Sequence, residues 1–319
     1  MVSIFDGPTL DIVVWWQVST MWICGRLTVR CGNTQRNANG RMGVSRHMLK
    51  IISWNIARRE LAWRSLLDSG ADVALLQEAT EPPSDVAQAL AIDPAPWRTA
   101  GTLDRPWRTA IVRLSERADV QWLEGKSVDD ARSGELAVSR LGTLTAAIVT
   151  PTTGLPITVA SIYAPWEKPR GSTWIYADAS VHRVISDLSL LIGREQGHRL
   201  IAAGDLNILH GYGEHGNDYW ASRYNTVFAR MSALGVPFVG PQIPAGRPAT
   251  PRPDELPATS KNVPTYHTKR QEPSTATRQL DFVFASDALG EQINVRALNE
   301  PDRWGPSDHC RVEITVGCD

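Results

Sequence analysis

The pattern of apolar and polar residues changes along this chain, and from Leu49 onward it alternates between two kinds of segment. Apolar runs of strand length lie at residues 49–54, 73–76, 109–114, 144–150, 157–162, 200–203, 280–284 and 312–316. Helices are predicted at 58–69, which Gly70 terminates, and at 175–194 and 225–234. Residues 241–264 hold seven prolines and are expected to form a long loop. Continuously apolar runs indicate strands buried on both faces, so the alternation predicts one α/β domain.

Residues 1–47 do not continue this pattern. Their apolar stretch, residues 12–24, is interrupted by polar residues and is shorter than the roughly 20 residues that span a bilayer. No basic residue precedes the stretch, whereas Asp6 and Asp11 do, so it makes a poor secretory signal. We therefore expect residues 1–47 to be an N-terminal extension or a misassigned start, and the domain to cover 48–319. The protein is expected to be cytoplasmic, without membrane insertion.

The composition narrows the class of protein. The 319 residues include 33 Lys and Arg against 34 Asp and Glu, with 42% hydrophobic and 21% charged residues, which is typical of a globular chain. The net charge of −1 does not indicate a strongly basic nucleic-acid-binding surface, although a local basic patch stays open. The four cysteines lack zinc-site spacing and the density of a disulfide scaffold, so we expect reduced thiols.

Polar side chains follow or interrupt several predicted strands. They are Asn55, Glu78, Tyr163, Asp205, Asn207, Asp281, Asp308 and His309. Ligands of open α/β folds bind at strand ends, so this placement predicts a shared site. Simpler explanations stay open for single residues, since Asn55 suits a helix N-cap and Asp205 with Asn207 suits an Asx turn. Asp281 is harder to explain in this way, because a carboxylate within an apolar strand needs a partner.

Six short motifs contain these residues in a fixed order. They are Ser53-Trp54-Asn55-Ile56, Leu76-Gln77-Glu78, Ile162-Tyr163-Ala164-Pro165, Gly204-Asp205-Leu206-Asn207, Gln279-Leu280-Asp281-Phe282-Val283 and Gly305-Pro306-Ser307-Asp308-His309. With this set the sequence resembles the endonuclease/exonuclease/phosphatase superfamily from about Leu49 to Thr315. The resemblance implies a four-layer αββα sandwich, in which two packed mixed β-sheets are flanked by helices.

The resemblance also implies a metal site and a base. Glu78 would be the principal Mg²⁺ ligand, with Asn55 and Asp308 nearby and with Mn²⁺ able to substitute; hard oxygen ligands suit these ions. Asp205 would orient or deprotonate the attacking water, and Asn207 would hold the phosphate or the nucleophile. A carboxylate is a weak base near neutral pH, so the metal is expected to polarise the phosphate or to lower the pKa of the water.

The remaining implied roles concern the transition state. Asp281 would hold His309 in one tautomer and favour the imidazolium. His309 and Tyr163 would then donate hydrogen bonds to the phosphoryl oxygens as negative charge develops.

The substrate is less specifically indicated. The residues after Glu78 and Asn207, and Trp166 itself, depart from the abasic-site endonuclease pattern. The chain also lacks the Lys- and Arg-dense loop of inositol-phosphate phosphatases and the export signal of secreted sphingomyelinases. Trp166 and Arg170 follow soon after Tyr163 and suit a stacked base and its backbone, or alternatively a solvent-exposed loop.

These observations predict a Mg²⁺-dependent phosphodiester hydrolase, a nuclease with DNA or RNA as its substrate. Two alternatives stay open. One is a phosphatase or phosphodiesterase for a small phosphorylated molecule or a phospholipid headgroup, and the other is a catalytically silent nucleic-acid-binding module. The complete set of Glu78, Asp205, Asn207, Asp281 and His309 disfavours the silent module, because binding alone does not need all of them.

Overall fold

The computed structural model describes residues 9–18, 21–30, 48–94, 96–100, 105–168, 171, 173–192 and 198–317. The chain separates into two compact units, Met1–Ser45 and Arg46–Asp319. In the first unit, β1 (Thr9–Val18) and β2 (Met21–Arg30) pair as an antiparallel ladder. A domain start near Met48 stays a prediction, which limited proteolysis of the full chain would test. Within the described ranges, no helix combines the length and apolar character needed to cross a membrane.

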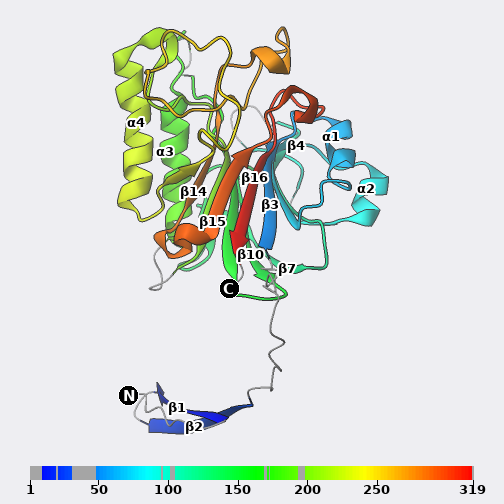
Figure 1. Cartoon of the computed structure of the whole chain (residues 1–319), viewed down its shortest axis with the longest axis vertical. Helices are drawn as coiled ribbons and strands as arrows, with labels where there is room; N and C mark the ends of the chain where they lie inside the picture. The colour runs from blue at the N-terminus through cyan, green and yellow to red at the C-terminus, as the bar shows by residue number, and fades with distance from the viewer. Residues whose placement is uncertain are drawn as a thin grey trace, which may run out of the picture. The chain divides into compact units, whose positions relative to one another are not determined.

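The second unit is built on two six-stranded mixed sheets (Figure 1). The first sheet has the strand order β13 (Phe238–Gly240), β14 (Asp281–Ala285), β12 (Leu200–Asp205), β11 (Ile157–Tyr163), β10 (Leu144–Pro151) and β7 (Ala118–Leu123). The second has the order β15 (Ile293–Ala297), β16 (Val312–Gly317), β3 (Met48–Asn55), β4 (Val73–Ala79), β6 (Arg108–Arg113) and β5 (Ala91–Ile92). A small parallel pair joins β8 (Gly125–Ser127) to β9 (Leu136–Val138).

Helices cover the outer face of each sheet. Figure 1 shows α3 (Ala177–Leu188) and α4 (Asp218–Ala233) beside the first sheet, and α1 (Glu60–Ser65) and α2 (Ser84–Ala89) beside the second. Short 3-10 helices are η1 (Ser189–Leu191), η2 (Glu214–Gly216), η3 (Pro273–Thr275), η4 (Asp287–Gln292) and η5 (Pro301–Arg303). The layers are therefore helices, sheet, sheet and helices, which confirms the predicted four-layer αββα sandwich.

Successive residues of the central strands enter different buried layers. In β4, Leu75 packs between the two sheets, whereas Leu76 packs in the layer that holds Trp63 of α1. In β12, Ile201 enters the layer between the sheets and Ala202 enters the layer beneath α3 and α4. Side chains alternate along a strand, so a strand with both faces covered needs apolar residues at every position. This explains the continuous apolar runs, each of which overlaps a strand of the structure.

The helix predictions were less accurate than the strand predictions. The predicted helix 58–69 is reduced to α1 at both ends. The left-handed backbone of Ala57 and Arg58 (φ 48° and 63°) delays its start, and residues 66–69 form turns and a bend after Ser65. The predicted helix 225–234 is too short, because α4 begins at Asp218, where the Asn217 side chain accepts the backbone N–H groups of Tyr219 and Trp220. The prediction for 175–194 corresponds to α3 and η1, and residues 193–194 lie outside the described ones.

Three further features can be compared with the sequence predictions: the proline-rich loop, the short strands and helices, and the cysteines. The proline-rich residues 241–264 form an irregular loop, as predicted. Within residues 48–317, the edge strands β5, β7, β13 and β15, the β8–β9 pair and the helix α2 were not predicted. Cys310 is a buried free thiol, and the other three cysteines lie outside the residues whose side chains are described.

The strand register brings the polar strand ends together. β3 and β4 run parallel with Asn55 opposite Gln77, and β11 and β12 run parallel with Tyr163 opposite Asp205. The antiparallel pair β12–β14 places Asp281 opposite Asp205. The carboxyl ends of β3, β4, β11 and β12 and the amino end of β14 therefore lie at the same end of the two sheets.

Candidate active site

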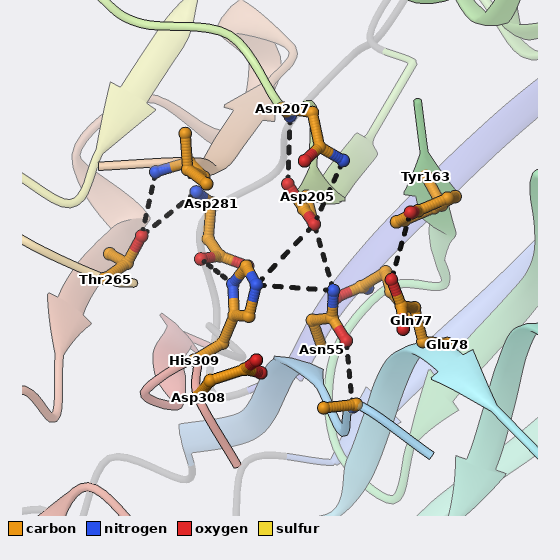
Figure 2. A network of polar contacts seen from close by, with 12 residues as sticks. Asn55, Gln77, Glu78, Tyr163, Asp205, Asn207, Thr265, Asp281, Asp308 and His309 are labelled. Atoms are coloured by element: carbon orange, nitrogen blue, oxygen red, sulfur yellow. Dashed lines mark hydrogen bonds and ion pairs between the residues drawn. The ribbon is translucent and has the colours of Figure 1, made fainter. Parts of the chain in front are cut away.

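A histidine between two buried aspartates forms the centre of this site (Figure 2). The Nδ1 atom of His309 lies 2.8 Å from Oδ2 of Asp281, and its Nε2 lies 3.8 Å from Oδ2 of Asp205. The backbone N–H of Asp281 donates to Oγ1 of Thr265 over 3.1 Å, which fixes the start of β14. Because His309 is 4% exposed and the aspartates 2% and 1%, water screens these charges little.

Two asparagines fix the orientation of Asp205. The Asn55 amide donates from Nδ2 to Oδ2 of Asp205 over 2.9 Å, while its Oδ1 accepts the backbone N–H of Ala57. The backbone N–H of Asn207 donates to Oδ1 of Asp205 over 2.9 Å, and its side-chain Nδ2 donates to Oδ2 over 3.3 Å. Asp205 and Asn207 thus form the Asx turn considered from the sequence, and Asp205 also faces His309. Asn55 is not a helix N-cap, because α1 begins five residues later at Glu60.

Burial shifts the proton affinities of the central groups. Removal from water raises the pKa of Asp205 to about 7, against the opposing effect of the His309 charge. Burial by itself lowers the pKa of His309, but the negative charges of Asp281 and Asp205 and the hydrogen bond to Asp281 outweigh it and raise this pKa to about 10. At neutral pH the imidazole is therefore protonated, and Asp205 lies near its midpoint.

A local irregularity in β4 turns Glu78 toward the same site. The register between β4 and β6 shifts between Leu76 and Ala79, and Glu78 has φ +47°. Such a bulge redirects a side chain that would otherwise follow the strand alternation. Oε1 of Glu78 accepts a hydrogen bond from the Tyr163 hydroxyl over 3.0 Å, and Oε2 lies 3.2 Å from Nε of Arg58. Burial and the Glu78 charge raise the pKa of Tyr163 well above its usual value, so the phenol keeps its proton.

Polar contacts beneath the site join the two sheets. The Ser161 hydroxyl of β11 donates to the Leu76 carbonyl of β4 over 2.7 Å and accepts from Nε2 of Gln77 over 3.0 Å. Gly204 of β12 leaves room for this contact, because a Cβ there would lie 3.2 Å from Nε2 of Gln77 in the other sheet and 1.8 Å from the Ile162 carbonyl oxygen of the neighbouring strand β11. Glu78 belongs to β4 and Asp205 to β12, which lie in different sheets. The contacts between the sheets therefore set the position of Glu78 relative to Asp205.

The site opens into a cleft of about 700 Å³. Asn55, Glu78, Asp205, Asn207, Asp308 and His309 all line it, as does the predicted substrate residue Trp166. Trp166 is 51% exposed and donates from Nε1 to the Asn207 carbonyl over 3.2 Å. Tyr163 and Asp281 do not line the cleft themselves. Tyr163 contacts the cleft residue Glu78, and Asp281 contacts the cleft residue His309. Arg170 lies outside the described residues, so its predicted contact with substrate stays a prediction.

Several residues that line this cleft were not predicted from the sequence. The Tyr266 ring lies 4.8 Å from the His309 ring, and Arg278 pairs with Glu214 through Nη2 and Oε2 at 2.9 Å. Tyr266 follows the proline-rich loop, which carries no local signal for a site. Arg278 directly precedes the motif that contains Asp281, and this proximity is the one signal that could have identified it.

The oxygen donors of the cleft fit a divalent ion of the Mg²⁺ type. Glu78 and Asp308 contribute carboxylates to one cleft, and Mg²⁺ is commonly bound by one or two carboxylates together with water. Among the described residues, no three His, Cys, Asp or Glu side chains gather as a closed metal cage. This donor set suits an open site with retained waters better than a structural metal. The assignment of Glu78, Asn55 and Asp308 as ligands stays a prediction.

Comparison with known proteins agrees with this geometry. The family model for the Endonuclease/Exonuclease/phosphatase family matches residues 52–309, so the chain belongs to this family. The matched range starts in β3 and ends at His309, and therefore includes the whole polar centre. No relative matches among curated proteins.

Solved structures with this fold include several nucleases. The AP endonuclease LMAP from Leishmania major has a TM-score of 0.54 at 16% identity, over 90% of this chain and 92% of that one. An AP endonuclease from Archaeoglobus fulgidus has a TM-score of 0.52 at 16% identity, over 84% and 99% of the two chains. The endonuclease domain of TRAS1, a telomere-specific non-LTR retrotransposon, has a TM-score of 0.52 at 15% identity, over 84% and 97%. These similarities show the shared fold.

Proposed function

We propose that this protein is a divalent-metal-dependent phosphodiesterase that hydrolyses nucleic acid. The observation that carries the proposal is the Asp281–His309–Asp205 arrangement in a cleft that also holds the Glu78 and Asp308 carboxylates. One protonated imidazole, one carboxylate close to its pKa and further oxygen donors are the groups that metal-assisted hydrolysis of a phosphodiester requires. Family membership and the nuclease fold support the same reaction class.

In the proposed mechanism Asp205 is the general base. Its pKa of about 7 gives it far more basicity than an exposed aspartate, so it can accept a proton from water near neutral pH. Asn55 and Asn207 hold both carboxylate oxygens and keep the base in one orientation. With its raised pKa, Asp205 is a stronger base near neutral pH than an ordinary exposed carboxylate.

His309 is the proposed donor to the phosphoryl oxygens. Asp281 holds Nδ1, so the proton on Nε2 is directed toward the cleft and toward Asp205. A charge-assisted hydrogen bond from the imidazolium would strengthen as negative charge develops on the phosphoryl group. Tyr163, with its raised pKa, stays protonated; it orients Glu78 in the structure and is the second proposed donor.

Glu78 and Asp308, with Asn55 beside them, are the proposed holders of Mg²⁺ or Mn²⁺. When bound, the ion would supply positive charge that polarises the phosphate and lowers the pKa of a coordinated water. The salt bridge between Arg58 and Glu78 keeps one carboxylate oxygen at the cleft surface. Arg58 is half exposed, so it can move aside at small cost.

A panel of substrates tests this proposal. The full-length protein would be incubated with supercoiled DNA, single-stranded DNA, RNA and small phosphate mono- and diesters, with Mg²⁺ or with EDTA. Cleavage of nucleic acid that requires the metal is the expected result. Turnover confined to small esters would favour the phosphatase or small-molecule phosphodiesterase alternative. Binding of nucleic acid without turnover of any substrate would favour the silent binding module.

A further inference from the structure

A second cavity, of about 360 Å³, opens beside the active-site cleft. Trp166, Asn207, Glu214 and Arg278 line both cavities, so the two adjoin and share a wall. Three of the six residues that line the second cavity alone are aromatic, namely Trp174, Trp220 and Tyr224. We call this second cavity the aromatic side pocket.

The rings of the aromatic side pocket are held in place by their neighbours. Trp220 of α4 lies 6.1 Å from Trp174 and 6.1 Å from Tyr224, measured between ring centroids. The Arg223 guanidinium lies 5.7 Å from the Trp220 ring and is anchored by the buried Asp178 carboxylate at 2.6 Å. Cation–π contact and the ion pair limit the motion of Trp220. The pocket is therefore largely formed before any ligand arrives.

The surfaces offered by the pocket are flat and apolar. Trp174 is 57% exposed and Trp166 is 51% exposed, although large indole side chains are usually mostly buried. Among the described lining residues, the charged ones are Glu214 and Arg278, and these pair with each other at 2.9 Å. A pocket with this charge balance offers little to a phosphate group. It suits a flat, neutral, polarisable ring.

We propose that the aromatic side pocket binds an unpaired nucleobase of the strand whose phosphodiester occupies the cleft. This inference rests on the proposed function, since it takes the cleft to hold a phosphodiester. Trp166 connects the two cavities, because its ring lines both and its Nε1 donates to the Asn207 carbonyl. The base next to the scissile phosphate would then stack on indole surfaces while the phosphate lies at Asn207 and His309.

The pocket selects a substrate class. A base within a duplex is stacked on its neighbours and cannot enter a side pocket unless it is displaced. Stacking on aromatic side chains is tolerant of sequence, because every base has a π-face. The protein is therefore expected to prefer single-stranded or locally unpaired nucleic acid, with weak dependence on sequence.

Binding to strands with and without bases tests the pocket directly. The probes are a fluorescently labelled oligothymidylate and an equally long abasic oligomer with the same phosphates, and affinity is measured by anisotropy in EDTA to prevent cleavage. The wild-type protein is expected to bind oligothymidylate roughly 10-fold more tightly than the abasic oligomer. Trp174→Ala is expected to remove most of this difference, and Trp174→Phe, which keeps a ring, to retain most of it.

Tyr219→Ala is the matched control. Tyr219 is a 55% exposed aromatic residue on the same helix as Trp220, its ring lies 5.2 Å from the Trp220 ring, and it does not line the pocket. Equal affinity of the wild-type protein for both probes, or an unchanged ratio in Trp174→Ala, would overturn the pocket assignment. Mg²⁺-dependent cleavage is measured separately on the same preparations. Base-dependent binding without cleavage would support the pocket assignment and contradict the proposed function. Cleavage without base-dependent binding would support the proposed function and contradict the pocket assignment.

Discussion

The Nδ1 atom of His309 lies 2.8 Å from Oδ2 of Asp281, and both side chains are almost completely buried. Because Nδ1 is committed to this carboxylate, the second ring nitrogen is left for Asp205 and the cleft. The same contact and the Asp205 charge keep the ring protonated in spite of its burial. The pair therefore fixes both the tautomer and the charge of the ring that lines the cleft.

The pH dependence of kcat/KM should report these groups. Below pH about 7 Asp205 holds a proton and cannot serve as the proposed base, and above pH about 10 His309 loses the proton of its proposed hydrogen bond to the phosphoryl group. We expect kcat/KM at saturating metal to rise to a plateau with the first group and to fall with the second. Replacing Asp281 with Asn removes a negative charge that raises the His309 pKa, so the alkaline limb should move to lower pH. An alkaline limb that stays in place in Asp281→Asn would contradict the assigned pairing.

Asp205→Asn separates activity from stability. Loss of the base is expected to lower kcat by a factor of about 10² to 10⁴. The folded-state pKa of Asp205, about 7, lies above that of an exposed aspartate, so the folded protein holds this proton more tightly than the unfolded chain. The contribution of Asp205 to the free energy of unfolding therefore declines as the pH rises toward 7. Above pH 7 the buried charge of Asp205 is unfavourable to the folded state. At pH 8 the variant should melt at the same temperature as the wild type or higher.

Asp254→Asn provides the comparison for that experiment. Asp254 is an exposed carboxylate in the proline-rich loop and does not line the cleft. This control is expected to keep both kcat and melting temperature. A large fall in the melting temperature of Asp205→Asn would count against the proposed cost of burying its charge.

Glu78→Gln tests the metal site. Replacing a carboxylate ligand with a neutral amide is expected to raise the Mg²⁺ concentration needed for half-maximal activity by at least about 10-fold. Titration calorimetry of Mg²⁺ without substrate should show the same loss of affinity. Glu255→Gln is the matched control, because Glu255 is an exposed carboxylate in the same cleft. Equal metal affinity in the two variants would exclude Glu78 as the principal ligand.

Ser161→Ala tests the contact between the sheets. The change removes the donor to the Leu76 carbonyl and the acceptor of the Gln77 amide, all of them buried. The Gln77 amide keeps acceptors at the Leu75 carbonyl and at Oγ of Ser53. The cost therefore falls mainly on the Leu76 carbonyl. Loss of a buried hydrogen-bond partner costs about 1–3 kcal/mol, and denaturant unfolding should show a loss of that size. Ser189→Ala removes a single hydrogen bond at an exposed serine and should change the free energy of unfolding little. Similar small losses in both variants would show that the Ser161 contact is dispensable.

The sequence predicted the central strands and the polar strand ends well, and both rest on local signals. Ile51 and Ile52 enter different buried layers, so an unbroken apolar run marks each central strand. Asn55, Glu78, Asp205 and His309 lie within three residues of such runs. Their placement at strand ends predicted a shared site, whereas the individual role of each residue came from the family resemblance.

The features that were missed depend on contacts between distant segments. Arg278 pairs with Glu214, 64 residues away, and nothing near either residue indicates the partner. Trp174 and Trp220 meet only because α4 packs near the segment that precedes α3. The early start of α4 is different, since Asn217 before Asp218 is a local N-cap signal that the helical spacing alone overlooked.

The proposed cleavage of a phosphodiester of nucleic acid depends on both His309 and a divalent metal. The most direct measurement compares nicking of supercoiled plasmid, and cleavage of single-stranded DNA and RNA, by the full-length wild-type, His309→Ala and His215→Asn proteins with Mg²⁺ or EDTA. His215 is an exposed histidine outside the cleft, and Asn tolerates its left-handed backbone (φ 54°). Cleavage should require Mg²⁺, persist in His215→Asn and fall by about 10² or more in folded His309→Ala. Equal cleavage by His309→Ala and wild type, or cleavage that continues in EDTA, would contradict the account.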